Sequence, residues 1–244
     1  MAKKSPVFVE IGGGLWRRGS AGWKWAKRNL VRRKPKPPHP PLPEPKPKPR
    51  PTTKLPIEGC DYVSGPTPAE LKAAGKQFVC RYLSTPGNPK NLTKAEAARL
   101  RAADISIVLV FETTAKRALS GFAVGKDDAR SARAQARAIG VPDSVPLYFA
   151  VDFDPVGAEL ARVAAYIQGT ASILGIGGTG VYGGIDACKA CHSSCHWFWQ
   201  TYAWSGGKWY EGNHIEQYAN GVKIGGHSVD LDRAVKAEYG QWAP

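Results

Sequence analysis

Acidic residues that follow short apolar segments are the first candidates for chemistry in this sequence. Residues 147–154 alternate apolar side chains with polar or small ones, and the polar set ends in Asp152 and Asp154. A period of two predicts a β-strand with one apolar face and one face that carries both carboxyls. The other acidic residues at the ends of predicted strands are Asp61, Glu112, Asp230 and Asp232.

Several carboxyls in one cleft favour acid–base chemistry, because neighbouring negative charges raise some pKa values and leave others low. Glycoside hydrolysis uses this split: a protonated acid protonates the leaving oxygen, and a carboxylate faces the developing positive charge. The candidate catalytic residues are therefore Asp152, Asp154, Glu112 and Asp61. Carboxylates also suit Mg²⁺ or Ca²⁺, but no histidine accompanies them in a metal spacing, so we predict neither metal nor cofactor. The structural alternative is that the 152/154 pair caps the next helix.

Aromatic and polar side chains near the ends of the same predicted strands are candidates for binding a sugar. Flat surfaces against which sugar rings can pack could come from Trp204, Tyr182, Tyr82, Trp197 and Trp199. The candidate substrate-binding residues are Asp230, Asp232, Arg81, Tyr82, Tyr182, Gln200, Trp204 and Gln217.

Strands and helices alternate from residue 55 onward, and these elements must position the candidate residues. Strands are predicted over 57–63, 78–83, 105–111, 147–154, 180–183, 197–204, 214–218 and 228–232. Helices are predicted from Thr67 onward and over 93–103, 125–139, 158–174, 186–196 and 233–239. This pattern predicts an α/β fold, a compact and partly irregular (β/α)₈ TIM barrel whose strand ends meet at one mouth. An open doubly wound sheet is the alternative, but residues 61–65 are not the Gly-rich phosphate loop it needs.

Charge and proline content divide the chain into three parts. Residues 1–34 form a basic arm with tryptophans and glycines, 35–54 a Pro/Lys-rich linker, and 55–244 the barrel domain. The first 54 residues carry 15 Lys or Arg and two acidic residues, a net charge of +13 of the total +14. Ten prolines within residues 35–51 predict a stiff polyproline-II spacer.

The basic arm is predicted to be irregular and disordered, with a short basic helix conceivable over 22–34. Its charge suits an anionic partner such as nucleic acid, membrane headgroups or an acidic wall polymer. The alternative is a solvated tail or an assembly arm. No nucleic-acid-binding motif accompanies the charge.

No run of about 18 apolar residues predicts a transmembrane segment, and no signal peptide is visible, so synthesis in the cytoplasm is expected. Cys188, Cys191 and Cys195 recur on one face of a predicted helix together with His192 and His196. We interpret the cysteines as buried core residues. A zinc site is the alternative, and the first part of this segment also has a haem-attachment spacing.

Three segments carry a resemblance to a known family. Residues 216–221, 224–226 and 229–232 resemble the closing motif of glycoside hydrolase family 25, the lysozymes that cleave peptidoglycan. Residues 59–64 look like that family's opening strand with its active-site Asp, and residues 147–154 look like its Asp-x-Glu strand. Over about residues 56–240 the chain is most similar to a related glycoside-hydrolase-like TIM-barrel domain of unknown function from actinobacteria and their phages.

The resemblance implies a peptidoglycan-directed, muramidase-like hydrolase that lyses cell walls, as a phage lysin or virion-associated enzyme. It would act at the cell wall or within a phage particle. The alternative is a non-catalytic module that binds cell-wall glycan, such as a phage tail component anchored by the basic arm.

One departure from the family pattern concerns the proton donor. The family has Glu where this chain has Asp154, which is shorter by one methylene. A proton donor must lie within hydrogen-bond reach of the leaving oxygen. Either Asp154 donates to a substrate that sits deeper, or Glu112 substitutes, or hydrolysis is weakened or lost. Asp152 would then stabilise charge, and Asp61 and Asp230 would position the substrate.

Overall fold

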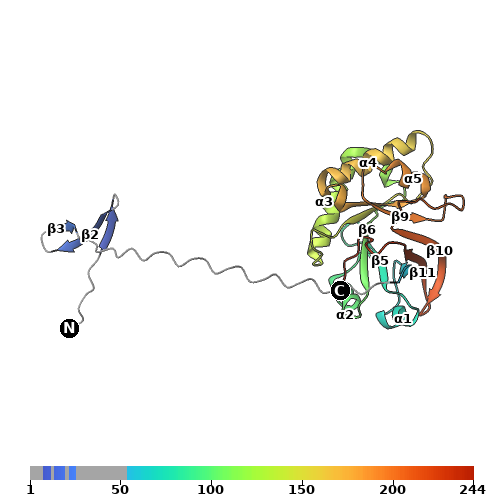
Figure 1. The fold of residues 1–244 in the computed structure, drawn as a ribbon, viewed down its shortest axis with the longest axis horizontal. Coiled ribbons are helices and arrows are strands. Elements are labelled where there is room, and N and C mark those ends of the chain that lie inside the picture. Colours follow the sequence, from blue (N-terminus) through green and yellow to red (C-terminus); the bar gives the residue numbers. More distant parts are fainter. Residues whose placement is uncertain (1–7, 12–13, 20–21, 26–53) are drawn as a thin grey trace. The chain divides into compact units, whose positions relative to one another are not determined.

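The computed structural model describes residues 8–11, 14–19, 22–25 and 54–244 (Figure 1). The chain divides into two compact units, residues 1–49 and 50–244, and each is described by itself.

The N-terminal unit contains a three-stranded antiparallel sheet of β1 (Phe8–Ile11), β2 (Gly14–Gly19) and β3 (Gly22–Trp25). These three short strands were not predicted from the sequence, and β3 occupies residues 22–25, where a short helix was conceivable. Aromatic and β-branched residues favour strands, and the alternation in Trp23-Lys24-Trp25 is a signal that the charge pattern concealed. Residues 26–34 and the proline-rich segment up to residue 53 lie outside the described residues.

The second unit is a closed eight-stranded barrel, as predicted. The barrel order is β10-β11-β4-β5-β6-β7-β8-β9. The strands are β4 (Ile57–Asp61), β5 (Phe78–Leu83), β6 (Ser106–Phe111), β7 (Leu147–Ala150), β8 (Thr179–Gly183), β9 (Trp197–Thr201), β10 (Ile215–Ile224) and β11 (His227–Ala234).

The last strand departs from a regular (β/α)₈ barrel. All neighbouring strands from β4 through β10 pair in parallel, whereas β11 is antiparallel to both β10 and β4. It returns from β10 through Gly225 and Gly226, whose φ angles of 57° and 82° suit glycine in a tight turn. Because β11 runs away from the mouth, Asp230 lies opposite Asp61 although it stands in the first half of its strand.

Five α-helices belong to the barrel unit: α1 (Pro68–Ala73), α2 (Lys94–Ala102), α3 (Gly121–Ala138), α4 (Ala158–Leu174) and α5 (Ile185–Ala190). Two short 3₁₀ turns occupy Arg117–Ser120 and Ile176–Gly178. Thr67 and Glu70 form the predicted capping box at the start of α1. The helix predicted over 233–239 is wrong, because β11 continues to Ala234 and completes hydrogen-bonded ladders on both of its sides.

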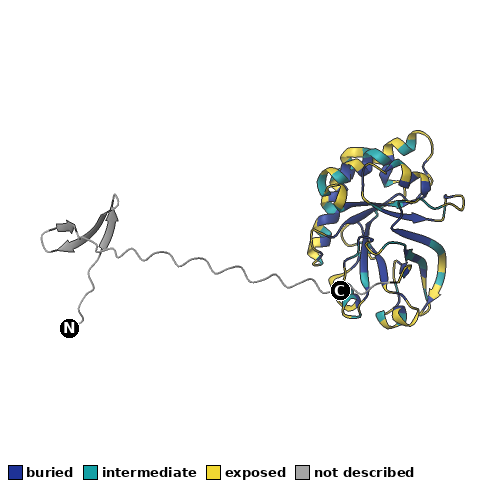
Figure 2. Ribbon diagram, viewed as in Figure 1, coloured by how far each residue is buried: buried dark blue, intermediate teal, exposed yellow. Residues whose placement is uncertain are grey.

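Two apolar layers hold the barrel together, and Figure 2 shows buried residues along the strands and exposed residues on the outer faces of the helices. Leu147 and Phe149 of β7 pack in the layer between strands and helices. Tyr148 and Ala150 of the same strand point into the barrel interior. The period of two over 147–150 is therefore confirmed, but β7 ends at Ala150, so Asp152 and Asp154 follow the strand rather than belong to it.

The three clustered cysteines are buried, as predicted for core residues: Cys188, Cys191 and Cys195 are 0%, 0% and 3% exposed. The helix predicted over 186–196 ends at Ala190, and Cys195 is reached through the following turn. Within residues 54–244 and the three short strands, no three His, Cys, Asp or Glu side chains gather as a metal-binding group. Among the same residues, no helix has both the length and the apolar character to cross a membrane.

Candidate active site

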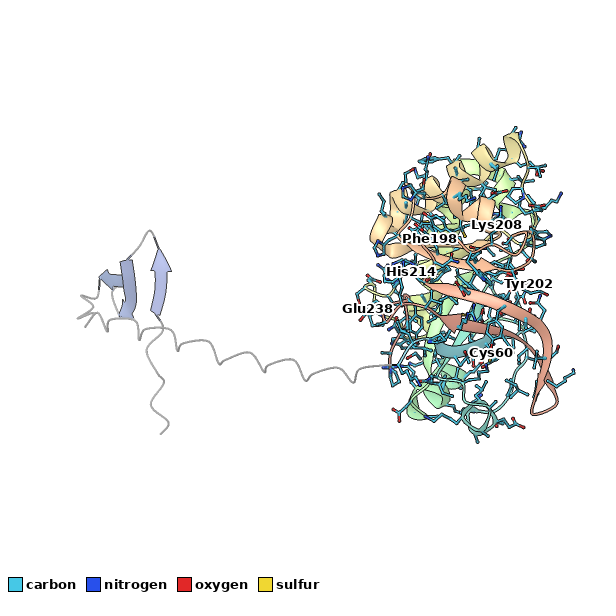
Figure 3. The ribbon with its side chains drawn as sticks, turned by 45° about the vertical axis from the view of Figure 1, so that its right-hand side comes forward. Cys60, Phe198, Tyr202, Lys208, His214 and Glu238 are labelled. Carbon is cyan, nitrogen blue, oxygen red and sulfur yellow. The ribbon has the colours of Figure 1, made fainter. Side chains whose placement is uncertain are left out.

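A cavity of about 240 Å³ lies at the mouth of the barrel, where the parallel strands end. It is lined by Asp61, Tyr82, Val110, Glu112, Asp152, Tyr182, Trp199, Gln217, Asn220 and Asp230. Figure 3 shows Tyr202, which follows β9, at one end of the barrel and His214, which precedes β10, at the other. Side chains from all eight barrel strands or the loops directly after them thus meet in one hollow, as the barrel hypothesis requires.

Asp61 is at the centre of the hydrogen bonds in this cavity. Its Oδ1 accepts from the Tyr82 hydroxyl at 2.9 Å, and its Oδ2 accepts from Gln217 Nε2 at 2.7 Å. The Gln217 Oε1 in turn accepts from the Tyr182 hydroxyl at 2.9 Å. Four residues predicted separately at strand ends therefore form one connected network across β4, β5, β8 and β10.

The environment of Asp61 favours its protonated form more than water would. The side chain is buried, and this burial raises the pKa of Asp61 to about 7, with the negative charge of Asp230 as the next cause. The hydrogen bonds from Gln217 and Tyr82 act in the opposite direction, because they stabilise the carboxylate.

Asp152 and Glu112 form a second acidic pair in the cavity. Asp152 is half-buried, and its pKa is raised first by burial and then by the negative charge of Glu112. The Glu112 carboxylate pairs with Lys90, whose Nζ lies 3.1 Å from Glu112 Oε1. Lys90 also lies over the ring of Tyr82, 5.0 Å from its centroid. The two carboxyls of this pair thus have different surroundings: Glu112 is held by a lysine, whereas burial and a neighbouring negative charge raise the pKa of Asp152.

The sequence analysis missed Val110 and Asn220, which line the cavity, and the charged residue that pairs with Glu112, Lys90. It lies in the loop between β5 and α2, in the segment Pro89-Lys90-Asn91, which has no periodicity and no known motif. Only the fold brings this loop over the end of β5, so we identify no sequence signal that could have found it.

Asp154 does not share the cavity with Asp152. Its residue is exposed, and it is not among the residues that line the hollow. The alternation that would place both side chains on one face ends with β7 at Ala150. The structure therefore brings Asp152, and not Asp154, together with Glu112 and Asp61.

The two acids of β11 occupy different depths. Asp230 lines the cavity, and its Oδ1 accepts from the backbone N–H of Gly221 at 2.8 Å. Gly221 lies within the irregular part of β10, where pairing with β11 shifts register between Gln217 and Val222. Asp232 lies deeper, is 0% exposed, and accepts from Trp199 Nε1 at 2.8 Å.

Arg81 and Gln200 were predicted to bind substrate, but both point away from the barrel interior. Arg81 binds Glu96 at 2.7 Å and 3.1 Å and donates to the Tyr62 carbonyl at 2.6 Å, so it fastens α2 to β5. Gln200 contacts Lys208, Tyr210 and Asn213, which orders the loop after β9. Successive side chains of a strand point to opposite faces, and each of these two residues is next to a residue that points into the barrel. Both side chains therefore point outward.

Trp204 lies in the loop after β9, with a φ of 55° and a 43% exposed side chain. Its Cβ lies close to Gly184, directly after β8, so the residue is at the rim of the barrel. It does not line the mouth cavity, which Trp199 lines instead.

A second hollow of about 500 Å³ adjoins the mouth cavity. The two share Asp61, Tyr82 and Asp230, and the second continues along residues 62–64 and the hairpin tip at 226–228. The acidic cavity therefore opens sideways into a longer groove rather than ending as a closed pit.

Comparison with known proteins gives a family that agrees with this geometry. The chain matches the model of the Rv2525c-like, glycoside hydrolase-like domain over residues 69–235. It is 30% identical over 200 residues to Rv2525c of Mycobacterium tuberculosis, which is named as a candidate peptidoglycan hydrolase, with coverage of 75% of this chain and 82% of that protein.

Solved structures support the same assignment. The crystal structure of the Tat-secreted Rv2525c of Mycobacterium tuberculosis with L-tartrate has a TM-score of 0.72 and 27% identity, over 77% of this chain and 99% of that one. The modular autolysin LytC of Streptococcus pneumoniae has a TM-score of 0.53 and 10% identity, over 93% and 51%, and this likeness concerns the fold alone. The chain belongs to the Rv2525c-like family of glycoside hydrolase-like domains, which confirms the resemblance to an actinobacterial barrel of this type.

Proposed function

We propose that this protein is a glycoside hydrolase that cleaves the glycan strands of peptidoglycan in the barrel-mouth cavity. The observation that carries the proposal is the pair Asp152 and Glu112, two carboxyls with different surroundings in one hollow. The family and the name of its mycobacterial relative give the substrate class.

Asp152 is the proposed proton donor. Burial and the negative charge of Glu112 raise its pKa, so that it holds a proton at a higher pH than an exposed aspartate. The proton passes from Asp152 to the glycosidic oxygen as the bond to the anomeric carbon breaks. A water molecule then supplies hydroxyl to that carbon, and its proton restores the acid.

Glu112 is the proposed carboxylate that faces the positive charge at the anomeric carbon. Its ion pair with Lys90 at 3.1 Å holds the side chain in place at the end of β6. Asp61 and Asp230, which line both the cavity and the adjoining groove, are proposed to position the substrate. The rings of Trp199 and Tyr182 give the cavity an apolar wall against which a sugar can pack.

A second candidate function is binding of cell-wall glycan without hydrolysis. The observation that favours it is the exposure of Asp154, which stands where the family 25 lysozymes have their acid. We also propose that the protein acts at the cell wall. A phage lysin and a phage tail component are the two proposed biological settings.

Incubation of the purified full chain with actinobacterial peptidoglycan tests the proposal. We expect soluble muropeptides to appear, detected by mass spectrometry, and to be absent with a heat-denatured sample of the same protein. Retention on the insoluble wall without any soluble product would support the second candidate instead.

The basic arm gives a separate prediction. The first 54 positions hold 15 of the 34 Lys and Arg residues. We therefore expect a chain that lacks residues 1–54 to bind anionic polymers far more weakly than the full chain. Binding by the full chain should fall as salt rises, because screening weakens exposed charge interactions. The thermal midpoint of residues 55–244 should stay within about 2 °C of the full chain. A larger drop, measured by calorimetry, would show that the arm stabilises the barrel.

A further inference from the structure

Asp232 is the most deeply buried carboxyl near the cavity, and the proposed reaction does not use it. Its side chain is 0% exposed, and its residue pairs with Gly59 of β4 below the level of Asp61. One carboxyl oxygen, Oδ1, accepts a hydrogen bond from Trp199 Nε1 at 2.8 Å.

The other carboxyl oxygen of Asp232 has no hydrogen-bond donor. Among the described residues, nothing donates to Oδ2, which is buried, while the carboxyl of Asp61 is its neighbouring group. Two carboxylates only repel each other, and a buried anionic oxygen without a donor is unfavourable. A proton on Oδ2 removes both problems, because the resulting O–H donates to Asp61.

Hydrogen bonding indicates which of the two acids holds this proton. Asp61 already accepts from Tyr82 and Gln217, and such bonds stabilise a carboxylate. Asp232 accepts from Trp199 alone. Burial, followed by the charge of Asp61, raises the pKa of Asp232 well above its usual range, in agreement with this assignment.

Other titratable groups surround the pair on every side. Those that face Asp232 are Cys60 and Asp61 of β4, Cys80 of β5, Tyr182 of β8, Tyr218 of β10 and Asp230 of its own strand. Burial raises the pKa of both thiols, so they do not supply a negative charge that would compete with Asp61.

We propose that Asp232 is a positioning residue that works as a neutral carboxylic acid, whose Oδ2–H donates to Asp61 and fixes that carboxylate at the floor of the cavity. Its effect on activity rests on the proposed function, whereas the location of the proton rests on the hydrogen-bond geometry alone. Asp232 is thus assigned to the support of the site rather than to contact with substrate.

The variant Asp232→Asn separates this role from that of a catalytic carboxylate. The amide can donate through Nδ2 to Asp61 and accept through Oδ1 from Trp199, so both hydrogen bonds survive. We expect Asp232→Asn to retain glycan release within about threefold, and Asp232→Leu, which has similar volume but no donor, to lose roughly 100-fold.

The dependence of stability on pH tests the proton without any activity. The folded state keeps the Asp232 proton that the unfolded chain loses above about pH 4, so the stability it contributes falls as pH rises toward the folded pKa. Over that window, each pH unit should weaken the folding equilibrium of the wild type about tenfold more than that of Asp232→Asn. Denaturant titrations of the full chain at a series of pH values measure this, with Asp154→Asn, at an exposed position outside the cavity, as a matched control that keeps the slope.

Infrared spectroscopy gives an independent readout. Above the pKa of Asp61, at about pH 8.5, the wild type should show the C=O band of a protonated carboxylic acid, and Asp232→Asn should lack it. Equal pH slopes for wild type and Asp232→Asn, or no such band in the wild type, would overturn the proposal. So would full activity in a folded Asp232→Leu protein. If the wild type releases no glycan, the slope and the band still decide on Asp232.

Discussion

Asp152→Asn and Glu112→Gln are each expected to reduce glycan release by roughly 10²–10⁴-fold, whereas Asp154→Asn should keep at least about half of the wild-type rate. The first two variants remove the proposed proton donor and the proposed charge-stabilising carboxylate from the cavity. The third alters an exposed residue that does not line it. Rates of soluble muropeptide release under identical conditions measure all three.

Stability measurements show whether a loss of activity reflects chemistry or misfolding. Burial and the negative charge of Glu112 raise the pKa of Asp152 in the folded state. The folded protein therefore loses stability as the pH rises from the usual aspartate pKa to this raised value. We therefore expect Asp152→Asn to melt at or above the wild-type temperature at neutral pH. A folded Asp154→Asn protein as inactive as Asp152→Asn would show that the donor assignment is wrong.

Gly125→Ala is expected to lower the free energy of unfolding by roughly 2–4 kcal/mol. A Cβ at Gly125 of α3 would lie 2.1 Å from the backbone oxygen of Tyr166 in α4. The contact is reciprocal, since a Cβ at Gly169 of α4 would lie 2.1 Å from the Phe122 oxygen of α3. Backbone atoms cannot move aside as a flexible side chain can, so the two helices must separate along their contact.

Gly177→Ala is the matched control, because a Cβ there meets nothing within 4 Å and the backbone is not left-handed. Its free energy of unfolding should stay within about 0.5 kcal/mol of the wild type. Thermal unfolding should show a midpoint lower by about 5–15 °C for Gly125→Ala and little change for the control. Equal midpoints for the two variants would contradict the close α3–α4 packing.

The barrel was predictable because most of its strands and helices have recognisable local sequence patterns. Apolar runs such as residues 106–111 end in an acid or a turn, and Thr67 and Thr93 cap the helices that follow as predicted. The direction of β11 was not predictable in this way, because alternation in Val229-Asp230-Leu231-Asp232 is the same whether a strand runs up or down. Only its pairing with β4 reveals that it is antiparallel.

The site residues at strand ends could be predicted from the sequence, but the full set of residues that line the cavity could not. Asp61, Glu112, Asp152 and Gln217 meet as expected, because parallel strands carry their last residues to one mouth. Arg81 and Gln200 lie one residue away from side chains that point into the barrel, so they point to its outer face. Lys90 comes from a loop whose sequence has no periodic pattern. The position at which a strand ends determines whether the following acidic side chains still point into the cavity. Asp154 is exposed because β7 ends at Ala150.

The most direct test of the central claim is the chemical nature of the bond that is cut. Soluble products from peptidoglycan treated with the full chain are reduced with borohydride and compared by mass spectrometry with unreduced products. Cleavage of a glycosidic bond by Asp152 and Glu112 predicts one new reducing sugar end per cut, absent with Asp152→Asn. Products that carry new amino ends but no new reducing ends would show that a peptide bond is cut, and would contradict the account.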